Sequence, residues 1–195
     1  MKILRAKDLR PTPWKNGGGS TSEIAVTPEG ASLEDFDWRI SMAHIASDGT
    51  FSEFPGIDRT LAIVRGEGLM LAIGSDTPQM LDHGSDPIGF PGDVPASARL
   101  TKGDITDLNV MTRRGRFSHR LHKILDPAFP ALDDNETAVV LLFNGSTTLY
   151  FGQDIVRLDH ADAVILSATD ESCLRIEPTA SCDCYLVLLH KHELT

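Results

Sequence analysis

Short apolar runs separated by glycine and proline recur along the whole chain. No long stretch repeats its apolar residues at the 3.6-residue period of a helix, so the pattern predicts an all-β sandwich or barrel. Strands are predicted at residues 22–26, 38–43, 59–64, 68–73, 105–111, 138–143, 163–166, 173–176 and 184–189. Helix is expected only as single turns near residues 32–36 and 126–132.

The order of these runs occurs twice. A strand ending in glycine, an acidic turn and a closing strand lie at residues 61–66, 89–93 and 107–111, and again at residues 140–145, 162–166 and 184–188. This repeat predicts one unit of residues 1–195 with two similar lobes, at about 1–115 and about 116–195. The connection is expected between Arg114 and Asp134. Short apolar patterns also recur by chance in all-β proteins, so a chain without duplication is the alternative.

The segment P-W-K-N-G-G-G-S-T at residues 13–21 is a candidate ligand-binding loop. It is not a phosphate loop, because its lysine precedes the glycines and a strand, not a helix, follows. Gly17 and Gly18 permit close backbone approach beside an aromatic, a cation and an amide, namely Trp14, Lys15 and Asn16. This combination suits a small anionic or amide-bearing ligand. The alternative is a tight turn in which Trp14 packs into the core.

Two predicted strands carry polar residues in alternation. Arg39 and Ser41 share one face of their strand, and Asp107 and Asn109 share one face of another. If the first face lines a barrel interior, the Arg39 guanidinium can bind a carboxylate with two hydrogen bonds. An exposed arginine is the alternative interpretation.

Metal and covalent chemistry lack the residues they need. Ser52 and Phe54 stand near the places where small metal-binding barrels carry histidines, and residues 94–96 provide no imidazole. The H-x-x-H pattern beginning at His119 and the H-x-H pattern beginning at His190 are weak, and no G-x-S-x-G motif occurs. No metal and no cofactor are therefore expected.

Charge and cysteine usage restrict the partners. Lys+Arg 18 against Asp+Glu 28 gives 18 − 28 = −10, which disfavours nucleic acid and anionic membranes. No apolar stretch is long enough to span a bilayer, and the N-terminal residues lack the apolar core of a secretory signal. The three cysteines, an odd number near the C-terminus, fit a reducing cytoplasm.

Five motifs in order over about residues 1–115 resemble the HutD/Ves family: P-W-K-N-G-G-G-S-T-S-E-I, W-R-I-S-M-A, F-S-E-F-P-G-I-D-R-T-L, F-P-G-D-V-P-A and D-L-N-V-M-T-R-R-G. The resemblance implies a cupin-like double β-barrel, bicupin-like with two lobes. It also implies a link to bacterial histidine utilisation and to a ligand such as formylglutamate or urocanate. The family's signature positions correspond to Trp14, Lys15, Asn16, Gly17, Gly18, Arg39, Ser41, Arg59 and Asn109.

The leading hypothesis is a non-enzymatic, metal-free binding protein for a small anionic metabolite, which regulates the pathway. Lys15 and Arg39 would supply charge, Asn16 and Asn109 amide contacts, and Trp14 an apolar wall. One rival is a metal-independent isomerase or hydrolase that uses Asp107, Glu23 or a histidine as general base. Another is an interaction protein that forms a homodimer or binds a regulator through sheet edges.

Overall fold

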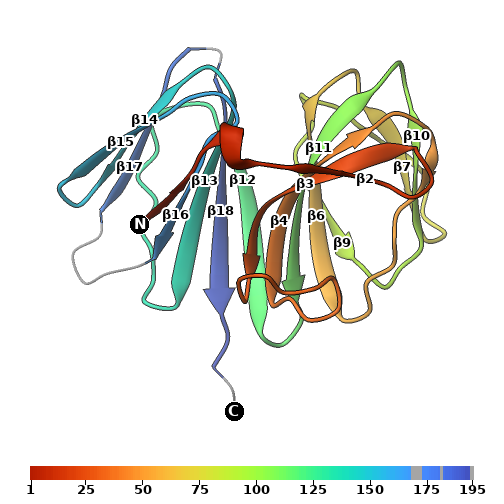
Figure 1. Cartoon of the computed structure of the whole chain (residues 1–195), viewed down its shortest axis with the longest axis horizontal. Helices are drawn as coiled ribbons and strands as arrows, with labels where there is room; N and C mark the ends of the chain where they lie inside the picture. Colours follow the sequence, from red (N-terminus) through yellow and green to blue (C-terminus); the bar gives the residue numbers. More distant parts are fainter. Residues whose placement is uncertain (168–172, 181, 194–195) are drawn as a thin grey trace. The chain divides into compact units, whose positions relative to one another are not determined.

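The computed structural model describes residues 1–167, 173–180 and 182–193. Strands are the main secondary structure of these residues, and the one helix among them is the 3₁₀ turn η1 (Ala6–Asp8) (Figure 1). The chain folds as two compact units. The N-terminal unit comprises Arg10–Phe117, and the C-terminal unit comprises Met1–Leu9 with Ser118–Thr195. No helix in the described part of the chain is long and apolar enough to cross a membrane.

The N-terminal unit contains two antiparallel sheets. The larger has the order β2-β3-β4-β11-β6-β9, with β2 (Pro11–Pro13), β3 (Gly19–Thr27), β4 (Trp38–Ile45), β11 (Ile105–Arg113), β6 (Ile57–Arg65) and β9 (Ile88–Pro91). The smaller has the order β5-β10-β7-β8, with β5 (Gly49–Thr50), β10 (Ala96–Leu100), β7 (Leu69–Ile73) and β8 (Gln79–Leu81). Leu61 and Ile63 of the larger sheet pack with Leu69 and Leu71 of the smaller, so the core lies between the two sheets.

The C-terminal unit also contains two antiparallel sheets. The larger has the order β1-β16-β13-β18-β12, with β1 (Lys2–Leu4), β16 (Ala163–Ser167), β13 (Glu136–Asn144), β18 (Asp183–Lys191) and β12 (Phe117–Ile124). The smaller has the order β15-β14-β17, with β15 (Asp154–Leu158), β14 (Thr147–Phe151) and β17 (Leu174–Pro178). Because β1 pairs with β16, the first residues of the chain belong to this unit and not to the N-terminal unit.

The two units share one strand order. The run β4-β11-β6-β9 has the same connectivity as β12-β18-β13-β16, and β7 lies between β8 and β10 as β14 lies between β15 and β17. In neither unit does a strand pairing among the described residues join the larger sheet to the smaller one. The all-β class is confirmed, whereas the closed double barrel is not, because each unit consists of two open sheets around a shared core.

All the predicted strands occur, and all but the one at residues 68–73 are longer than predicted. The two predictions of single helical turns were wrong. Residues 32–36 form only a hydrogen-bonded turn, and within residues 126–132 Ala128 bridges to Ile176 as an isolated β-bridge. The predicted connection between Arg114 and Asp134 contains strand β12. This strand was missed because its sequence is rich in basic and histidine side chains, as an edge strand tolerates.

Candidate functional site

One face of the larger sheet in the N-terminal unit collects polar side chains. In the register, Met111 lies opposite Arg39 and Arg59, while Asn109 lies opposite Ser41 and Leu61. Directly opposed residues and alternate residues along a strand share a face. Arg39, Ser41, Arg59, Asp107 and Asn109 therefore all lie on the face that carries Leu61 and Ile63, which points into the core of this unit. We call these five residues the polar cluster.

Arg59 is a buried cation surrounded by aromatic rings. Arg59 is only 3% exposed, and its Nη1 atom donates a hydrogen bond to the Ser52 carbonyl oxygen at 3.1 Å. Its Cζ lies 5.0, 5.8 and 5.2 Å from the ring centroids of Phe51, Phe54 and Phe90. Burial lowers the pKa of Arg59 to about 10, although the charge of Asp107 acts in the opposite direction. The guanidinium thus stays charged at neutral pH, stabilised by cation–π contacts, with Nε left without a hydrogen-bond partner.

Asp107 is a buried carboxyl that is only half satisfied. It is 1% exposed, and Oδ1 accepts a hydrogen bond from the Ala43 backbone N–H at 3.2 Å, while Oδ2 has no partner. Burial raises the pKa of Asp107 to about 7, and the positive charge of Arg59 offsets part of that effect. Among the described residues no ion pair joins Asp107 to Arg59. The group can therefore hold or release a proton near neutral pH.

Asn109 and Ser41 lie beside each other across β11 and β4, and both are buried. The Asn109 Oδ1 atom has no hydrogen-bond partner. The Ser41 hydroxyl accepts a hydrogen bond from Arg39 Nη1 at 3.2 Å, and Arg39 Nε donates to Glu23 Oε2 at 2.8 Å. Arg39 is therefore already paired with a carboxylate of its own chain, whereas Arg59 has no such ion pair among the described residues.

The glycine-rich segment forms the hairpin between β2 and β3. Trp14 packs against the core of the N-terminal unit and donates from Nε1 to Thr21 Oγ1 at 2.8 Å. A Cβ atom on Gly19 would lie 2.2 Å from the His44 carbonyl oxygen, so only glycine permits this approach to β4. Lys15 and Asn16 lie exposed on the hairpin, where Asn16 Oδ1 accepts the Gly18 N–H at 3.0 Å.

Of the predicted site residues, the structure thus brings Arg39, Ser41, Arg59 and Asn109 onto one sheet face and packs Trp14 on the same core. It leaves Lys15, Asn16 and Gly17 exposed on the hairpin, with Gly18 half-buried. The sequence interpretation missed the aromatic residues around Arg59. Phe54 begins the first F-P-G turn and Phe51 lies three residues before it, but no spacing rule signals that their rings meet a cation supplied by a later strand.

Several motif residues have a structural task instead. Gly92 N–H donates to the Ile57 carbonyl and Phe54 N–H to the Gly92 carbonyl, both at 2.7 Å, which joins the two F-P-G turns. Arg114 donates to Asp58 Oδ1 at 2.9 Å and to Asp93 Oδ2 at 3.1 Å. These contacts fix the turns that carry Phe54 and precede Arg59.

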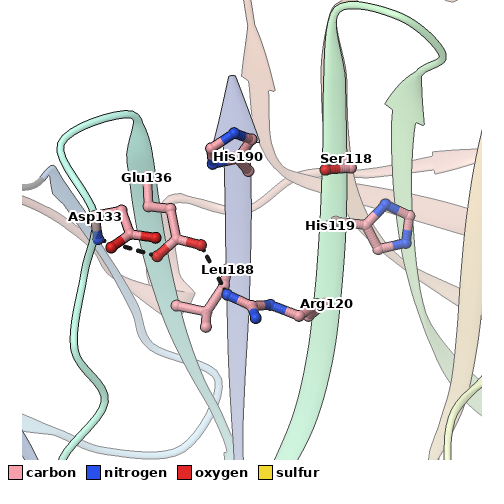
Figure 2. A pocket seen from close by; sticks show the side chains of 7 residues that line it. All are labelled: Ser118, His119, Arg120, Asp133, Glu136, Leu188 and His190. Carbon is pink, nitrogen blue, oxygen red and sulfur yellow. Dashed lines mark hydrogen bonds and ion pairs between the residues drawn. The ribbon is translucent and has the colours of Figure 1, made fainter. Parts of the chain in front are cut away.

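The histidine patterns noted in the sequence lie in the C-terminal unit. His119 and His190 line a polar pocket over β12 and β18 (Figure 2). Within the described residues no group of three or more histidine, cysteine, aspartate or glutamate side chains could hold a metal ion. Burial raises the pKa of Cys184 to about 12 and also raises that of Cys182, so neither thiol is a ready thiolate ligand or nucleophile.

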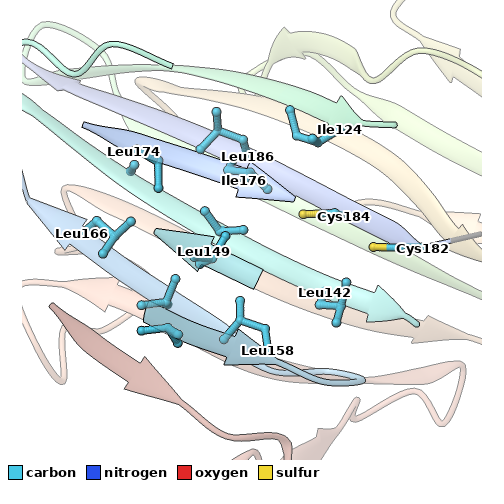
Figure 3. Close-up of a cluster of buried hydrophobic side chains, with 14 of the residues drawn as sticks. Ile124, Leu142, Leu149, Leu158, Leu166, Leu174, Ile176, Cys182, Cys184 and Leu186 are labelled. Carbon is cyan, nitrogen blue, oxygen red and sulfur yellow. The ribbon is translucent and has the colours of Figure 1, made fainter. Parts of the chain in front are cut away.

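The shared strand order provides an internal comparison for the polar cluster. The pairs Ile63–Asp107, Leu61–Asn109 and Arg59–Met111 correspond to Leu142–Cys184, Val140–Leu186 and Ala138–Leu188, counted back from the glycines that follow β6 and β13. The counterparts of Arg59, Asp107 and Asn109 are thus Ala138, Cys184 and Leu186, all buried in an apolar core. Figure 3 shows Cys184 and Leu186 in this core. The fold itself therefore does not require polar residues at these positions.

Comparison with solved structures shows that the fold is cupin-like. A cupin 2 conserved barrel domain protein from Leptotrichia buccalis superimposes with a TM-score of 0.59 at 12% identity and covers 97% of this chain and 96% of that one. Such low identity shows the fold alone.

The chain belongs to the HutD family, whose model matches residues 6–184. It is 34% identical over 175 residues to an "uncharacterized 21.2 kDa protein in hutC 3'region" of Pseudomonas putida, covering 88% of this chain and 89% of the relative. Protein Ves of Citrobacter koseri is 35% identical over 147 residues, covering 73% and 74% of the two chains. The structure of HutD from Pseudomonas fluorescens SBW25 ("Formate condition") superimposes with a TM-score of 0.85 at 28% identity, covering 98% and 99%.

Proposed function

We propose that this protein is a non-enzymatic, metal-free binding protein for a small carboxylate of histidine utilisation and regulates the pathway through that ligand. Its family, and the position of a relative's gene beside hutC, support the pathway. Formylglutamate and urocanate are the candidate ligands. The HutD structure from Pseudomonas fluorescens belongs to a "Formate condition", and formate is the smallest carboxylate.

The observation that carries the proposal is the buried guanidinium of Arg59, which is charged at neutral pH and forms no ion pair with a carboxylate in the described part of the chain. Burying a charge costs free energy unless a partner compensates, and the equivalent position in the C-terminal unit is alanine. A ligand carboxylate would pair with the guanidinium of Arg59. Asn109, whose Oδ1 is unpartnered, and Ser41 would contact the polar remainder of the ligand. Trp14 would provide an apolar wall and the paired Arg39 a second positive charge.

The test is calorimetric titration of the whole chain with formylglutamate, urocanate and histidine, with and without the substitution Arg59→Gln. The substitution removes the charge but keeps a polar side chain, and binding should weaken by roughly a hundredfold, the typical cost of truncating one partner of a buried charge pair. Arg99→Gln is the matched control, because Arg99 is exposed on β10. Absence of heat with all three compounds, or equal affinity in the Arg59→Gln variant, would overturn the proposal.

A second function is favoured by Asp107. A buried carboxyl whose pKa is about 7 suits a general acid or base, and the unpartnered Oδ2 is the atom that would exchange the proton. This supports a metal-independent isomerase or hydrolase acting on the same ligand class. Incubation of each compound with the protein, followed by chromatography, separates the two functions. An enzyme gives product that Asp107→Asn abolishes, whereas a binding protein returns the compound unchanged.

A further inference from the structure

The C-terminal unit holds a pocket of about 300 Å³ that the polar cluster does not involve. Its side chains come from three neighbouring strands, β12, β18 and β13, and from the turn before β13. Leu188 contributes the apolar part of the lining, and Arg120, Asp133 and Glu136 contribute the charges (Figure 2).

The same region of the N-terminal unit is filled. There Arg113 lies opposite Ile57, as His190 lies opposite Glu136, and Phe36 packs on Ile57 and Met111 with no exposed surface. Phe36 comes from the long segment before β4, whereas β12 follows a short turn after β11. The pocket of the C-terminal unit thus corresponds to the space that Phe36, from the segment before β4, fills in the N-terminal unit.

The charges of the pocket are arranged around a buried carboxylate that is already neutralised. The Glu136 side chain is 4% exposed, and its Oε1 accepts from Arg120 Nη2 at 2.8 Å, while Oε2 accepts the Asp133 backbone N–H at 3.2 Å. Arg120 uses one of its five N–H donors in this contact, and its side chain is 62% exposed. The Asp133 carboxylate makes no hydrogen bond or ion pair within the described residues.

An accessible cation and an accessible anion therefore line one pocket, and Figure 2 shows Arg120 and Asp133 on opposite sides of Glu136. We propose that this pocket binds a small zwitterion, an amino acid whose carboxylate contacts the Arg120 guanidinium and whose ammonium contacts the Asp133 carboxylate. Leu188 would contact the carbon chain, and the imidazole of His190 offers a further polar contact.

Size and charge both favour this class. The volume is at the lower end of the range for small-molecule sites, about 300–1,000 Å³, so it suits a compact ligand. One arginine against two carboxylates leaves a formal charge of 1 − 2 = −1 with the histidines neutral, which disfavours simple anions. The inference is independent of the carboxylate site in the N-terminal unit, since the two share no residue.

The probes are glycine, β-alanine and γ-aminobutyrate, zwitterions of increasing charge separation, with butyrate and butylamine as single-charge comparators. Each is titrated into the isotope-labelled full-length chain while the backbone amide resonances of β12, β13 and β18 are followed by NMR. At least one zwitterion should shift these resonances at millimolar concentration and bind roughly tenfold more tightly than either comparator, which has one charged contact fewer.

Asp133→Asn should weaken that binding by roughly tenfold, and Arg120→Lys, which keeps the partner of Glu136 but not the planar guanidinium, should weaken it too. Asp134→Asn is the matched control, because Asp134 is an exposed neighbour outside the pocket. The proposal is overturned if no zwitterion shifts these resonances, if butyrate or butylamine binds equally well, or if Asp134→Asn has the same effect as Asp133→Asn.

Discussion

Arg59 and Asp107 illustrate how burial alters two opposite charges that do not touch. Loss of hydration lowers the pKa of the first to about 10 and raises that of the second to about 7, and their mutual attraction only moderates both changes. The guanidinium gains three aromatic rings and one carbonyl, while the carboxyl gains one backbone N–H. The protein therefore holds unsatisfied polar atoms at a stability cost, which is typical of a functional site.

The Asp107 carboxyl should make stability depend on pH. Its folded pKa is raised from 3.8 to about 7, so its stabilising contribution is fully present below the lower value and is lost as pH rises through the higher one. Asp107→Asn cannot ionise and should escape this loss, which is at most ~4 kcal/mol above neutral pH. Urea unfolding of both proteins at acidic and mildly alkaline pH measures it. Asp76→Asn, at an exposed turn, serves as control, and parallel pH profiles for wild type and Asp107→Asn would contradict the burial argument.

At the scale of single elements, strands were predictable and their detailed partners were not. The alternation of side chains along a strand correctly predicted that Arg39 and Ser41 share one face, because the geometry of a strand alone fixes the direction of each side chain. The ion pair of Arg39 with Glu23 was not predictable, since it depends on a bulge in β3 between Glu23 and Ala25 that resets the register against β4. Likewise the rings around Arg59 come from two separate segments, the stretch that contains Phe51 and Phe54 and the later strand that contains Phe90, which only the tertiary fold brings together.

The hairpin between β2 and β3 should depend on Gly19 for steric reasons. Gly19→Ala would place a Cβ 2.2 Å from the His44 carbonyl and 3.0 Å from the Trp14 ring, so the hairpin must move away from β4. We expect a loss of roughly 1–3 kcal/mol in the free energy of unfolding, measured with urea. Gly49→Ala, whose Cβ would meet nothing within 4 Å, should change stability little. Equal effects of the two substitutions would remove the steric explanation.

At the scale of the whole molecule, the two units share one strand order but differ in the side chains that fill their interiors. The repeat was readable in the sequence because the strands and their glycines recur in the same order. The assignment of Met1–Leu9 to the C-terminal unit was not readable, because the pairing of β1 with β16 spans most of the chain and has no local signal. The interior of the N-terminal unit carries buried polar side chains at positions where that of the C-terminal unit carries apolar ones, so we expect these polar side chains to serve ligand binding and their apolar counterparts to serve core packing.

Reciprocal substitutions at matched positions test this division. Leu186→Asn places an amide in an apolar core without a partner and should cost roughly 3 kcal/mol or more. Asn109→Leu, the reverse change at the counterpart position, should leave stability nearly unchanged or raise it, and should weaken carboxylate binding. Chemical denaturation measures the first effect and calorimetry the second. If both substitutions destabilise the protein to the same extent, Asn109 is a structural residue.

The pairing of β1 with β16 also orders events during synthesis. Lys2 pairs with Ile165, and Arg5 forms a 2.5 Å ion pair with Asp162, so both contacts wait until more than 150 further residues have been made. Meanwhile every pairing within Arg10–Phe117 can already form. A nascent chain therefore carries β1 as an unpaired strand, with Ile3 exposed, ahead of a completed unit. In a chain whose synthesis stalls before β16, β1 keeps its unpaired backbone groups exposed. The corresponding strand of another unfinished copy can then pair with them.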